Sequence, residues 1–133
     1  MAVVVVDTNV LGIDRPLENA DMRRLLDEHK RGNLRLVVPQ IVIDEAVNKW
    51  AEKIADEESK RATAVGQLKS RGALPADHQD QALDADALRT EEMNRVLSAL
   101  GDAGVDIAPY PDIDHQQVVA RALRREQPFD REG

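Results

Sequence analysis

The sequence predicts an α/β domain built around a short parallel sheet. A β-branched run, residues 2–6, and a second predicted strand, residues 34–38, flank a stretch in which apolar residues recur at helical spacing. A third short apolar run, residues 105–108, is followed by two prolines. Strand, helix and strand in succession form a βαβ unit, whose crossover is almost always right-handed.

The first βαβ unit has clear local signals. Residues 2–6 show no polar and apolar alternation, which predicts a strand covered on both faces. Residues 12–20 predict a loop, and the following helix is expected to end near Arg31. Asp21 and Asn19 are both candidate N-caps for that helix, because each side chain can accept a hydrogen bond from a free backbone N–H.

The middle of the chain predicts two long helices. Apolar residues recur at helical spacing from Ile41, and no helix breaker precedes Gly66, so the first helix is expected to reach about Leu68. After a break and a polar link, helical spacing returns over residues 85–100. We expect these helices to form a hairpin, spanning about residues 41–103, that stands away from the sheet.

Beyond the third strand, the sequence predicts one more helix. Asp114 and Gln117 have the spacing of a capping box that would open a helix through about Arg125. Residues 127–133 show no periodicity. With 133 residues in all, we predict a single domain over residues 1–133.

Composition limits the function classes. The formal net charge of −7 argues against a protein that holds long nucleic acid by diffuse electrostatics, but it allows an acidic site that meets phosphate through a bound cation. The aromatic residues are only Trp50, Tyr110 and Phe129, so stacking platforms for bases are not expected. At helical spacing with its apolar neighbours, Trp50 is predicted to lie in the core. The three histidines have no partner at ligand spacing and are predicted to be surface residues.

Other absences set further expectations. The chain has no cysteine, so neither a disulfide framework nor a thiolate metal site is predicted. No apolar run approaches the roughly 20 residues of a membrane helix, and the first residues lack the basic start of a signal peptide. We therefore expect no membrane segment and a cytoplasmic location.

Acidic residues follow the first two predicted strands. Asp7 ends the first strand, where ligands bind in parallel sheets, although Asp-Thr-Asn is equally good turn and N-cap chemistry. Asp44 and Glu45 follow the second strand, where the helix dipole alone would also favour an acid. If the two strands are neighbours, Asp7 and Glu45 share one rim. Their repulsion would be relieved by a hard divalent cation, Mg²⁺ or Mn²⁺.

These residues carry a resemblance to a known family. The segments VVVVDTNVL and VVPQIVIDEAVNKW resemble the opening of a PIN-like domain, the fold of metal-dependent ribonucleases that includes many bacterial toxin nucleases. The later segment VDIAPYPDIDHQQVVARALRREQPF is similar to a PIN-like branch with a long helical insert. The resemblance covers nearly the whole chain and implies a three-layer α/β/α fold with a short parallel sheet and a protruding helical hairpin.

The resemblance also implies roles for individual residues. Asp7 and Glu45 would be the catalytic metal ligands for Mg²⁺ or Mn²⁺. The supporting positions around them would be Thr8, Asn9, Asp44 and Asn48. Arg121, on the last predicted helix, matches a family arginine and would contact phosphate.

The resemblance breaks near the end of the sequence. In the family, a third acid lies in a Gly-x-x-Asp-Ala type segment that opens a further helix and leads to a last strand. A pair like Pro128 and Phe129 precedes that segment, and the sequence ends at Gly133. We therefore expect the last helix, the last strand and the third carboxylate to be missing. Asp112 and Asp114 precede the helix that should come before the missing acid, so they are poor substitutes.

Two functions follow as hypotheses. The first is an endoribonuclease that hydrolyses phosphodiester bonds of single-stranded RNA with Mg²⁺ or Mn²⁺, here in an incomplete, weakly active or inactive form. A protein inhibitor such as an antitoxin would be one possible partner. The second is a non-catalytic PIN-like scaffold that binds a partner or forms a homodimer through an exposed sheet edge.

Overall fold

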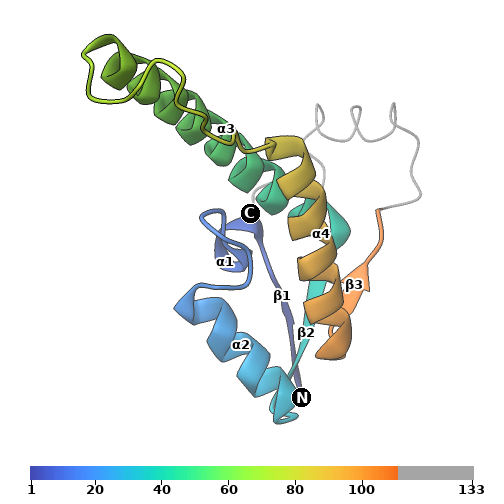
Figure 1. The fold of residues 1–133 in the computed structure, drawn as a ribbon. Helices are drawn as coiled ribbons and strands as arrows, with labels where there is room; N and C mark the ends of the chain where they lie inside the picture. The colour runs from blue at the N-terminus through green and yellow to red at the C-terminus, as the bar shows by residue number, and fades with distance from the viewer. Residues whose placement is uncertain (111–133) are drawn as a thin grey trace, which may run out of the picture.

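The structure, a computed structural model, describes residues 1–110. Figure 1 shows a small sheet with helices packed beside it and a long helical hairpin that extends away from it. In chain order the elements are β1 (Ala2–Val5), α1 (Thr8–Leu11), α2 (Ala20–Lys30), β2 (Leu34–Pro39), α3 (Gln40–Ser70), α4 (Ala85–Asp102) and β3 (Asp106–Ala108). The helix predicted over residues 114–125 lies outside the described residues.

The sheet is parallel, with strand order β1-β2-β3. Val4 pairs with Leu36 across β1 and β2, and Val38 pairs with Ile107 across β2 and β3. All three strands therefore end at one edge of the sheet, from which α1 and α3 start. The predicted fold class, α/β with a short parallel sheet, is confirmed.

One expectation for β1 is not met within the described residues. The side chains of Val3 and Val5 are 57% and 64% exposed, so the described residues cover only the face that carries Val4. On the open face, Arg35 of β2 donates a hydrogen bond from Nε to Asp106 of β3 at 2.7 Å. An unbroken β-branched run shows that a strand forms, but it does not show which faces are covered, because β-branched residues also favour half-buried strands.

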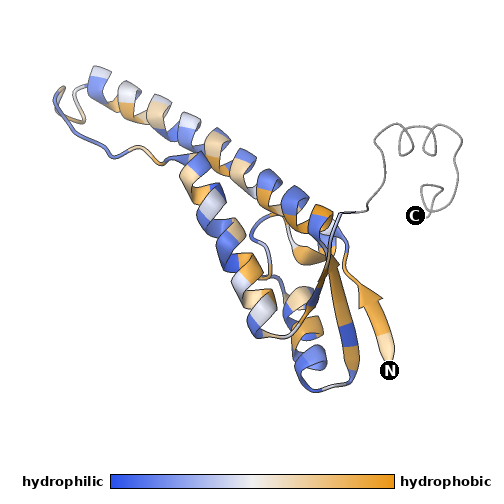
Figure 2. Cartoon of the chain, turned by 90° about the vertical axis from the view of Figure 1, so that its right-hand side faces the viewer, coloured by the Kyte–Doolittle hydropathy of each residue, from blue (hydrophilic) through white to orange (hydrophobic). Residues whose placement is uncertain are grey.

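The hydrophobic core lies between the covered face of the sheet and the helices. Its buried residues lie on α1, α2, β2, α3 and α4 and directly after β1; they include Val6, Leu11, Met22, Leu36, Val38, Ile43, Val47, Val96 and Leu100. Figure 2 shows that apolar residues dominate the strands, whereas hydrophilic residues alternate with apolar ones along α3 and α4. This pattern is typical of helices with one packed face.

The loop between α1 and α2 is fixed by a cap and a glycine. Of the two candidate N-caps, Asn19 is the one used: Oδ1 accepts from the N–H of Met22 at 2.7 Å, and Nδ2 donates to the carbonyl of Val10 at 2.9 Å. Gly12 has φ +106°, and a Cβ there would lie 2.8 Å from Asn19 Nδ2. A side chain at this position would therefore strain the backbone and push against the cap.

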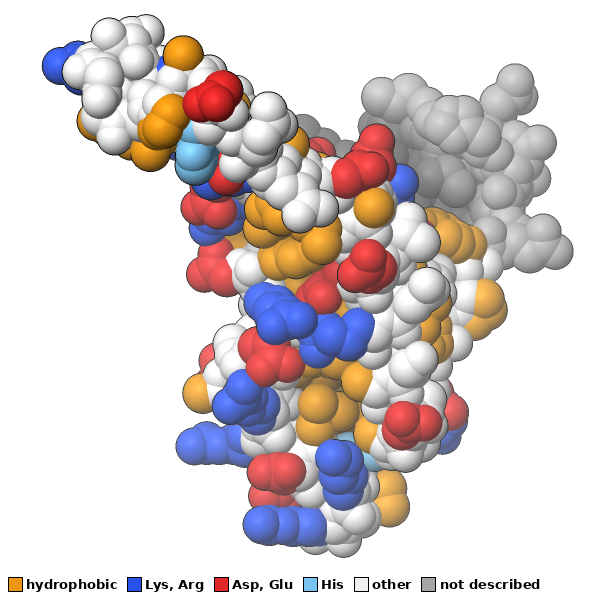
Figure 3. Space-filling view, viewed as in Figure 1, with side chains coloured by type: hydrophobic (Ala, Val, Ile, Leu, Met, Phe, Trp, Pro, Cys, Tyr) orange, Lys and Arg blue, Asp and Glu red, His pale blue; other side chains and the backbone are white. Residues whose placement is uncertain are grey.

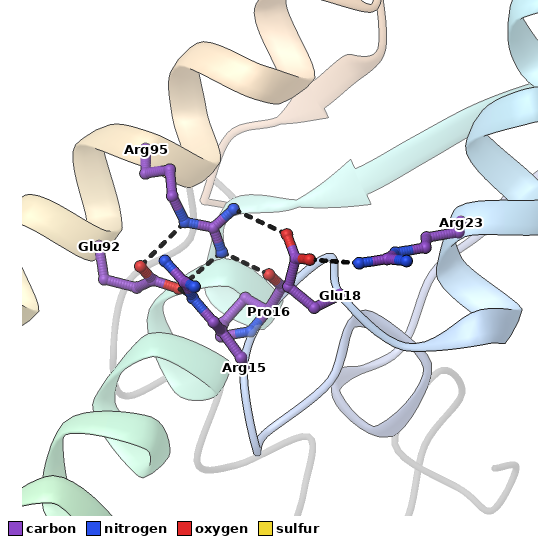
Figure 4. A network of polar contacts seen from close by, with 6 residues as sticks. All are labelled: Arg15, Pro16, Glu18, Arg23, Glu92 and Arg95. Atoms are coloured by element: carbon purple, nitrogen blue, oxygen red, sulfur yellow. Dashed lines mark hydrogen bonds and ion pairs between the residues drawn. The ribbon is translucent and has the colours of Figure 1, made fainter.

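A group of charged side chains ties the same loop to α4 (Figure 4). Glu92, only 4% exposed, accepts hydrogen bonds from Arg95 at 2.9 and 2.7 Å and lies 3.5 Å from Arg15. Arg95 also donates to the carbonyl of Pro16 at 2.6 Å and to Glu18 at 3.2 Å. Burial alone would raise the pKa of Glu92, but the two arginines outweigh burial and hold that pKa below its usual range.

His29 connects α2 to β2 and to the turn between α4 and β3, and the sequence did not predict these contacts. Its Nδ1 accepts a hydrogen bond from the N–H of Leu36 at 3.1 Å, and its Nε2 lies 3.2 Å from the carbonyl of Gly104. The carbonyl of Val37 accepts a hydrogen bond from the N–H of Val6, on the β1 side of β2. Because successive residues of a strand bond to opposite sides, the N–H of Leu36 points toward β3. β3 begins only at Asp106. The imidazole therefore replaces a missing strand partner at that end of the sheet.

The helical hairpin consists of α3, the link over residues 71–84 and α4. All four buried residues of α3 lie at or before Ala51, so its outer part packs little. There, Arg61 pairs with Glu58 at 2.8 Å and with Asp80 of the returning link. Trp50, predicted to be core, is half-buried in a hollow that it lines together with Arg15 and Arg95. Among the helices of the described chain, none is both long and apolar enough to cross a membrane.

Candidate active site

The candidate site lies where the first two strands leave the sheet. β1 and β2 are direct neighbours, so the residues that follow them share the same edge. Asp7 stands at the start of α1, and Asp44 and Glu45 lie in the first two turns of α3. The parallel βαβ unit thus brings together two acidic segments that are distant in the sequence.

Asp7 serves as the N-cap of α1. Its Oδ1 accepts a hydrogen bond from the N–H of Val10 at 2.8 Å, and its backbone is extended, as a cap requires. Within residues 1–110, Oδ2 has no hydrogen-bond partner, and the side chain is exposed. Capping fixes the carboxylate at the rim and leaves one oxygen for another ligand, so the structural and the functional interpretation of Asp7 are compatible.

Glu45 meets the first segment through Thr8. The hydroxyl of Thr8 donates a hydrogen bond to Oε1 of Glu45. On the other side, Oε2 lies 3.7 Å from Nζ of Lys49, one turn further along α3. The carboxylate of Glu45 is about half exposed, at 52%, so this ion pair is weakened by solvent.

Asp44 has both carboxylate oxygens occupied. Oδ1 accepts from Nε2 of Gln40 at 2.8 Å, and Oδ2 accepts from the hydroxyl of Tyr110, two residues after β3. This hydrogen bond raises the pKa of the Tyr110 hydroxyl, because the phenol proton is held between the two groups. Asp44 therefore has a hydrogen bond on each oxygen, whereas Glu45 has one hydrogen bond and one exposed ion pair.

An open hollow of about 400 Å³ surrounds these side chains, which we call the acidic hollow. Its lining residues are Ile41, Asp44, Glu45, Asn48, Lys49, Glu52 and Tyr110. Asn48 thus faces the same space as Glu45. Asn9 does not, because it lines a separate hollow formed by the loop after α1, together with Gly12 and Arg15. Arg121 lies outside the described residues.

Sequence reasoning did not single out four residues of the acidic hollow, Ile41, Lys49, Glu52 and Tyr110. Lys49 follows Glu45 by four positions, a spacing that brings side chains together on one helix face and so was available as a signal. Tyr110 offered no such signal, because its contact with Asp44 joins residues 66 positions apart. Only the fold brings the end of β3 next to the start of α3.

The donor chemistry of the rim suits a hard cation. Asp7, Thr8 and Glu45 offer only oxygen atoms, which Mg²⁺ and Mn²⁺ prefer over softer ligands. In the part of the chain that the structure describes, no group of three or more acidic or histidine side chains gathers closely enough to hold a metal. The oxygen donors of the rim are thus of the chemical type that binds a hard divalent ion.

Charge on the rest of the surface is mixed. In the view of Figure 3, basic and acidic side chains alternate and form no continuous basic patch. This view agrees with the net charge of −7 and offers no broad platform for a nucleic-acid backbone.

The structure is thus an α/β domain with acidic side chains at the carboxyl edge of a parallel sheet. A family model described as a PIN domain matches residues 4–133. The chain therefore belongs to the PIN domain family, whose members are in general nuclease-type, depend on divalent metals and typically bind RNA. Comparison with curated proteins gave no match, and neither did comparison with solved structures.

Proposed function

We propose that this PIN domain is an endoribonuclease that hydrolyses single-stranded RNA with Mg²⁺ or Mn²⁺. One observation carries the proposal: the hydrogen bond from Thr8 to Glu45, which brings the two acidic segments to one rim. Asp7 directly precedes Thr8, so we propose that the carboxylates of Asp7 and Glu45 bind one ion. A bound ion would supply Lewis-acid stabilisation of the phosphate and an activated water.

The chain's own residues then have distinct roles. Asp7 and Glu45 hold the ion, and Thr8 orients Glu45 by occupying one lone pair of Oε1. Asn48, beside Glu45 in the acidic hollow, is placed to donate a hydrogen bond to RNA. Asn9 on α1 and Asp44 on α3 are proposed supporting residues. Arg121 remains a proposed phosphate contact.

Lys49 links the ion to the substrate. Its ammonium group lies 3.7 Å from Oε2 of Glu45 and offsets part of the negative charge of that carboxylate. A divalent ion at Glu45 would displace this ammonium group, because two like charges repel at that distance. The flexible lysine is then free to meet a phosphate oxygen in the acidic hollow. Because the described residues contain no group of three or more acidic or histidine side chains that could hold a metal, we propose weak ion binding and slow cleavage.

A cleavage assay with matched variants tests this proposal. A fluorescently labelled single-stranded RNA is incubated with the protein and Mn²⁺, with and without EDTA. Wild-type protein should cleave it only with Mn²⁺, and Asp7→Asn and Glu45→Gln should each lower the rate by about 100-fold or more, equivalent to several kcal/mol of transition-state stabilisation.

The matched control is Glu52→Gln, which removes a carboxylate from the same hollow two turns further along α3. It should keep the wild-type rate within about twofold, because Glu52 is not at the rim. Equal loss in all three variants would show that general charge, rather than a specific ion site, supports cleavage. Absence of any Mn²⁺-dependent cleavage by the wild-type protein would refute the proposal.

The open edge of β1 favours a second candidate, a PIN-like scaffold. Among the described residues β1 pairs only with β2, and Val3 and Val5 are exposed beside that edge. Such an edge can pair with a second copy or with a partner such as a protein inhibitor. A dimer of the wild-type protein in light scattering that becomes a monomer in Val3→Lys would support this candidate. A cytoplasmic location belongs to both proposals.

A further inference from the structure

Tyr110 presents an aromatic ring to the candidate site. It follows β3 at the same edge of the sheet as the acidic residues, and its side chain is 52% exposed. Ile41, from the first turn of α3, lines the same hollow and is 56% exposed. Two large apolar side chains thus remain open to solvent beside the carboxylates, and neither is explained by packing of the described core.

The ring is held in place by its hydroxyl group. Tyr110 donates a hydrogen bond to Asp44, and Gln40 fixes the other oxygen of Asp44 at 2.8 Å. All three residues stand at the carboxyl edge, two of them in the first turns of α3. This chain of bonds anchors one end of the half-exposed ring, which limits the conformational entropy lost when a ligand packs on it.

The charge around the ring restricts what can pack there. Asp44, Glu45 and Glu52 line the acidic hollow, against one positive charge from Lys49. A phosphate group would be repelled from most of this surface, apart from Lys49 and an ion at Glu45. A nucleobase is flat, largely apolar on its faces and uncharged, so it can lie on Tyr110 and Ile41 without that penalty.

We propose that Tyr110 is the stacking platform for one unpaired base of the RNA, next to the phosphate that is cleaved, and that Asp44 is the residue that positions it. This inference rests on the proposed ribonuclease function and specifies its substrate. Bases in a duplex are stacked on each other and cannot offer a face to Tyr110, so the site selects single-stranded RNA. The low aromatic content of the sequence argued against stacking platforms, but a single ring is sufficient to stack one base.

Two measurements test the platform. The first is the KM for Mn²⁺-dependent cleavage of a single-stranded RNA. The second is the fluorescence of the same RNA with 2-aminopurine beside the cleaved bond, read by stopped flow before cleavage, since stacking quenches this base. Tyr110→Ala should raise KM by about 5- to 150-fold and abolish the quench. Tyr110→Phe keeps the ring and should stay within a few fold of wild type.

Asp44 is tested by rescue. Asp44→Ala removes the anchor and should reduce the quench, whereas Asp44→Asn keeps an acceptor oxygen for the Tyr110 hydroxyl and should restore it. Leu83→Ala is the matched control, since this residue is 53% exposed on the link before α4 and lies away from the hollow. It should leave KM and fluorescence unchanged. Thermal unfolding of each variant confirms that the fold is kept.

The outcomes separate this inference from the proposed function. If the wild-type protein cleaves RNA and Tyr110→Ala has the same KM and the same quench, the stacking platform is refuted and the ribonuclease stands. A duplex RNA cleaved as well as the single strand would also refute it. If the wild-type protein neither binds nor cleaves RNA, the proposed function fails and the platform fails with it.

Discussion

The hydroxyl of Thr8 donates a hydrogen bond to the carboxylate of Glu45, across 37 positions of the sequence. Thr8 opens α1 directly after Asp7, and Glu45 lies on α3 directly after β2. The bond therefore depends on the parallel pairing of β1 with β2, which puts both helix starts on one edge of the sheet. It is the contact from which the proposed ion site is built.

Removing the Thr8 hydroxyl should loosen the proposed site without unfolding the protein. Thr8→Val keeps the shape of the side chain and deletes the donor, so Glu45 loses the bond that orients it. Partners of this kind typically contribute about 10- to 100-fold to metal affinity. We expect the Mn²⁺ dissociation constant, measured by calorimetry, to rise by about that factor. Thr8→Ser keeps a hydroxyl and should bind Mn²⁺ like the wild type; a similar loss in both variants would contradict this role.

Glu92 is predicted to stabilise the fold rather than the site. Glu92→Ala leaves the half-buried guanidinium of Arg95 without its main partner and frees the loop that ends at Asn19. Because Arg95 is 30% exposed, water offsets part of the loss, and we expect the free energy of unfolding to fall by about 1 to 3 kcal/mol. Urea denaturation measures this change.

The neighbouring Glu91 is the matched control for Glu92. Its side chain is exposed, so Glu91→Ala should change the free energy of unfolding by less than about 0.5 kcal/mol. Equal effects of the two substitutions would mean that the charged group in Figure 4 contributes nothing specific to stability.

Acid should weaken the protein through the same carboxylates. Burial raises the pKa of Glu92, but the hydrogen bonds from Arg95 and Arg15 have the larger effect, so the net pKa is lowered. A hydrogen bond from Arg23 lowers the pKa of Glu18. Carboxylates with lowered pKa values in the folded state stabilise it fully above the unfolded pKa of about 4.3. This stability is lost as the pH falls through the folded values.

The melting temperature should therefore be flat from pH 7 to about pH 5 and fall steeply below about pH 4. Calorimetry across this range measures the change. Glu92→Gln should have a shallower fall than the wild type, because it lacks one of the titrating groups. A melting temperature that rises on acidification below pH 5 would contradict the assigned directions of these pKa shifts.

His29 should matter for stability in spite of its partial exposure. His29→Leu removes the acceptor for the N–H of Leu36, a residue whose side chain is fully buried, and the contact with Gly104. A buried donor without a partner costs about 1 to 3 kcal/mol, so the unfolding midpoint in urea should drop accordingly. His78→Leu serves as the control, since that side chain makes no hydrogen bond within residues 1–110, and an equal drop would argue against the bridge.

The sequence predicted the elements better than their contacts. The valine run, the capping residues and the long helical periodicity were enough to predict β1, α2, β2, α3 and α4, because each signal is local. The exposure of Val3 and Val5, the bridging role of His29 and the half-buried position of Trp50 depend on which elements pack together. Local patterns do not contain that information.

The same limit applies to the site. Asp7 and Glu45 could be singled out because parallel strands place their ends together, a rule that needs only the order of elements. Lys49 was within reach through its spacing from Glu45. Tyr110 was not, since its bond to Asp44 exists only once β3 is laid beside β2. Topology therefore predicts which segments meet, and the structure shows which side chains touch.

The most direct test of the central claim, that Asp7 and Glu45 share one divalent ion, is Mn²⁺ binding followed by electron paramagnetic resonance. Titration of the wild-type protein should show one bound Mn²⁺ per chain, and Asp7→Asn and Glu45→Gln should each abolish most of this binding, with no further loss in the double variant. Glu52→Gln should bind as the wild type does. The claim would be contradicted if either single variant bound Mn²⁺ with the wild-type dissociation constant.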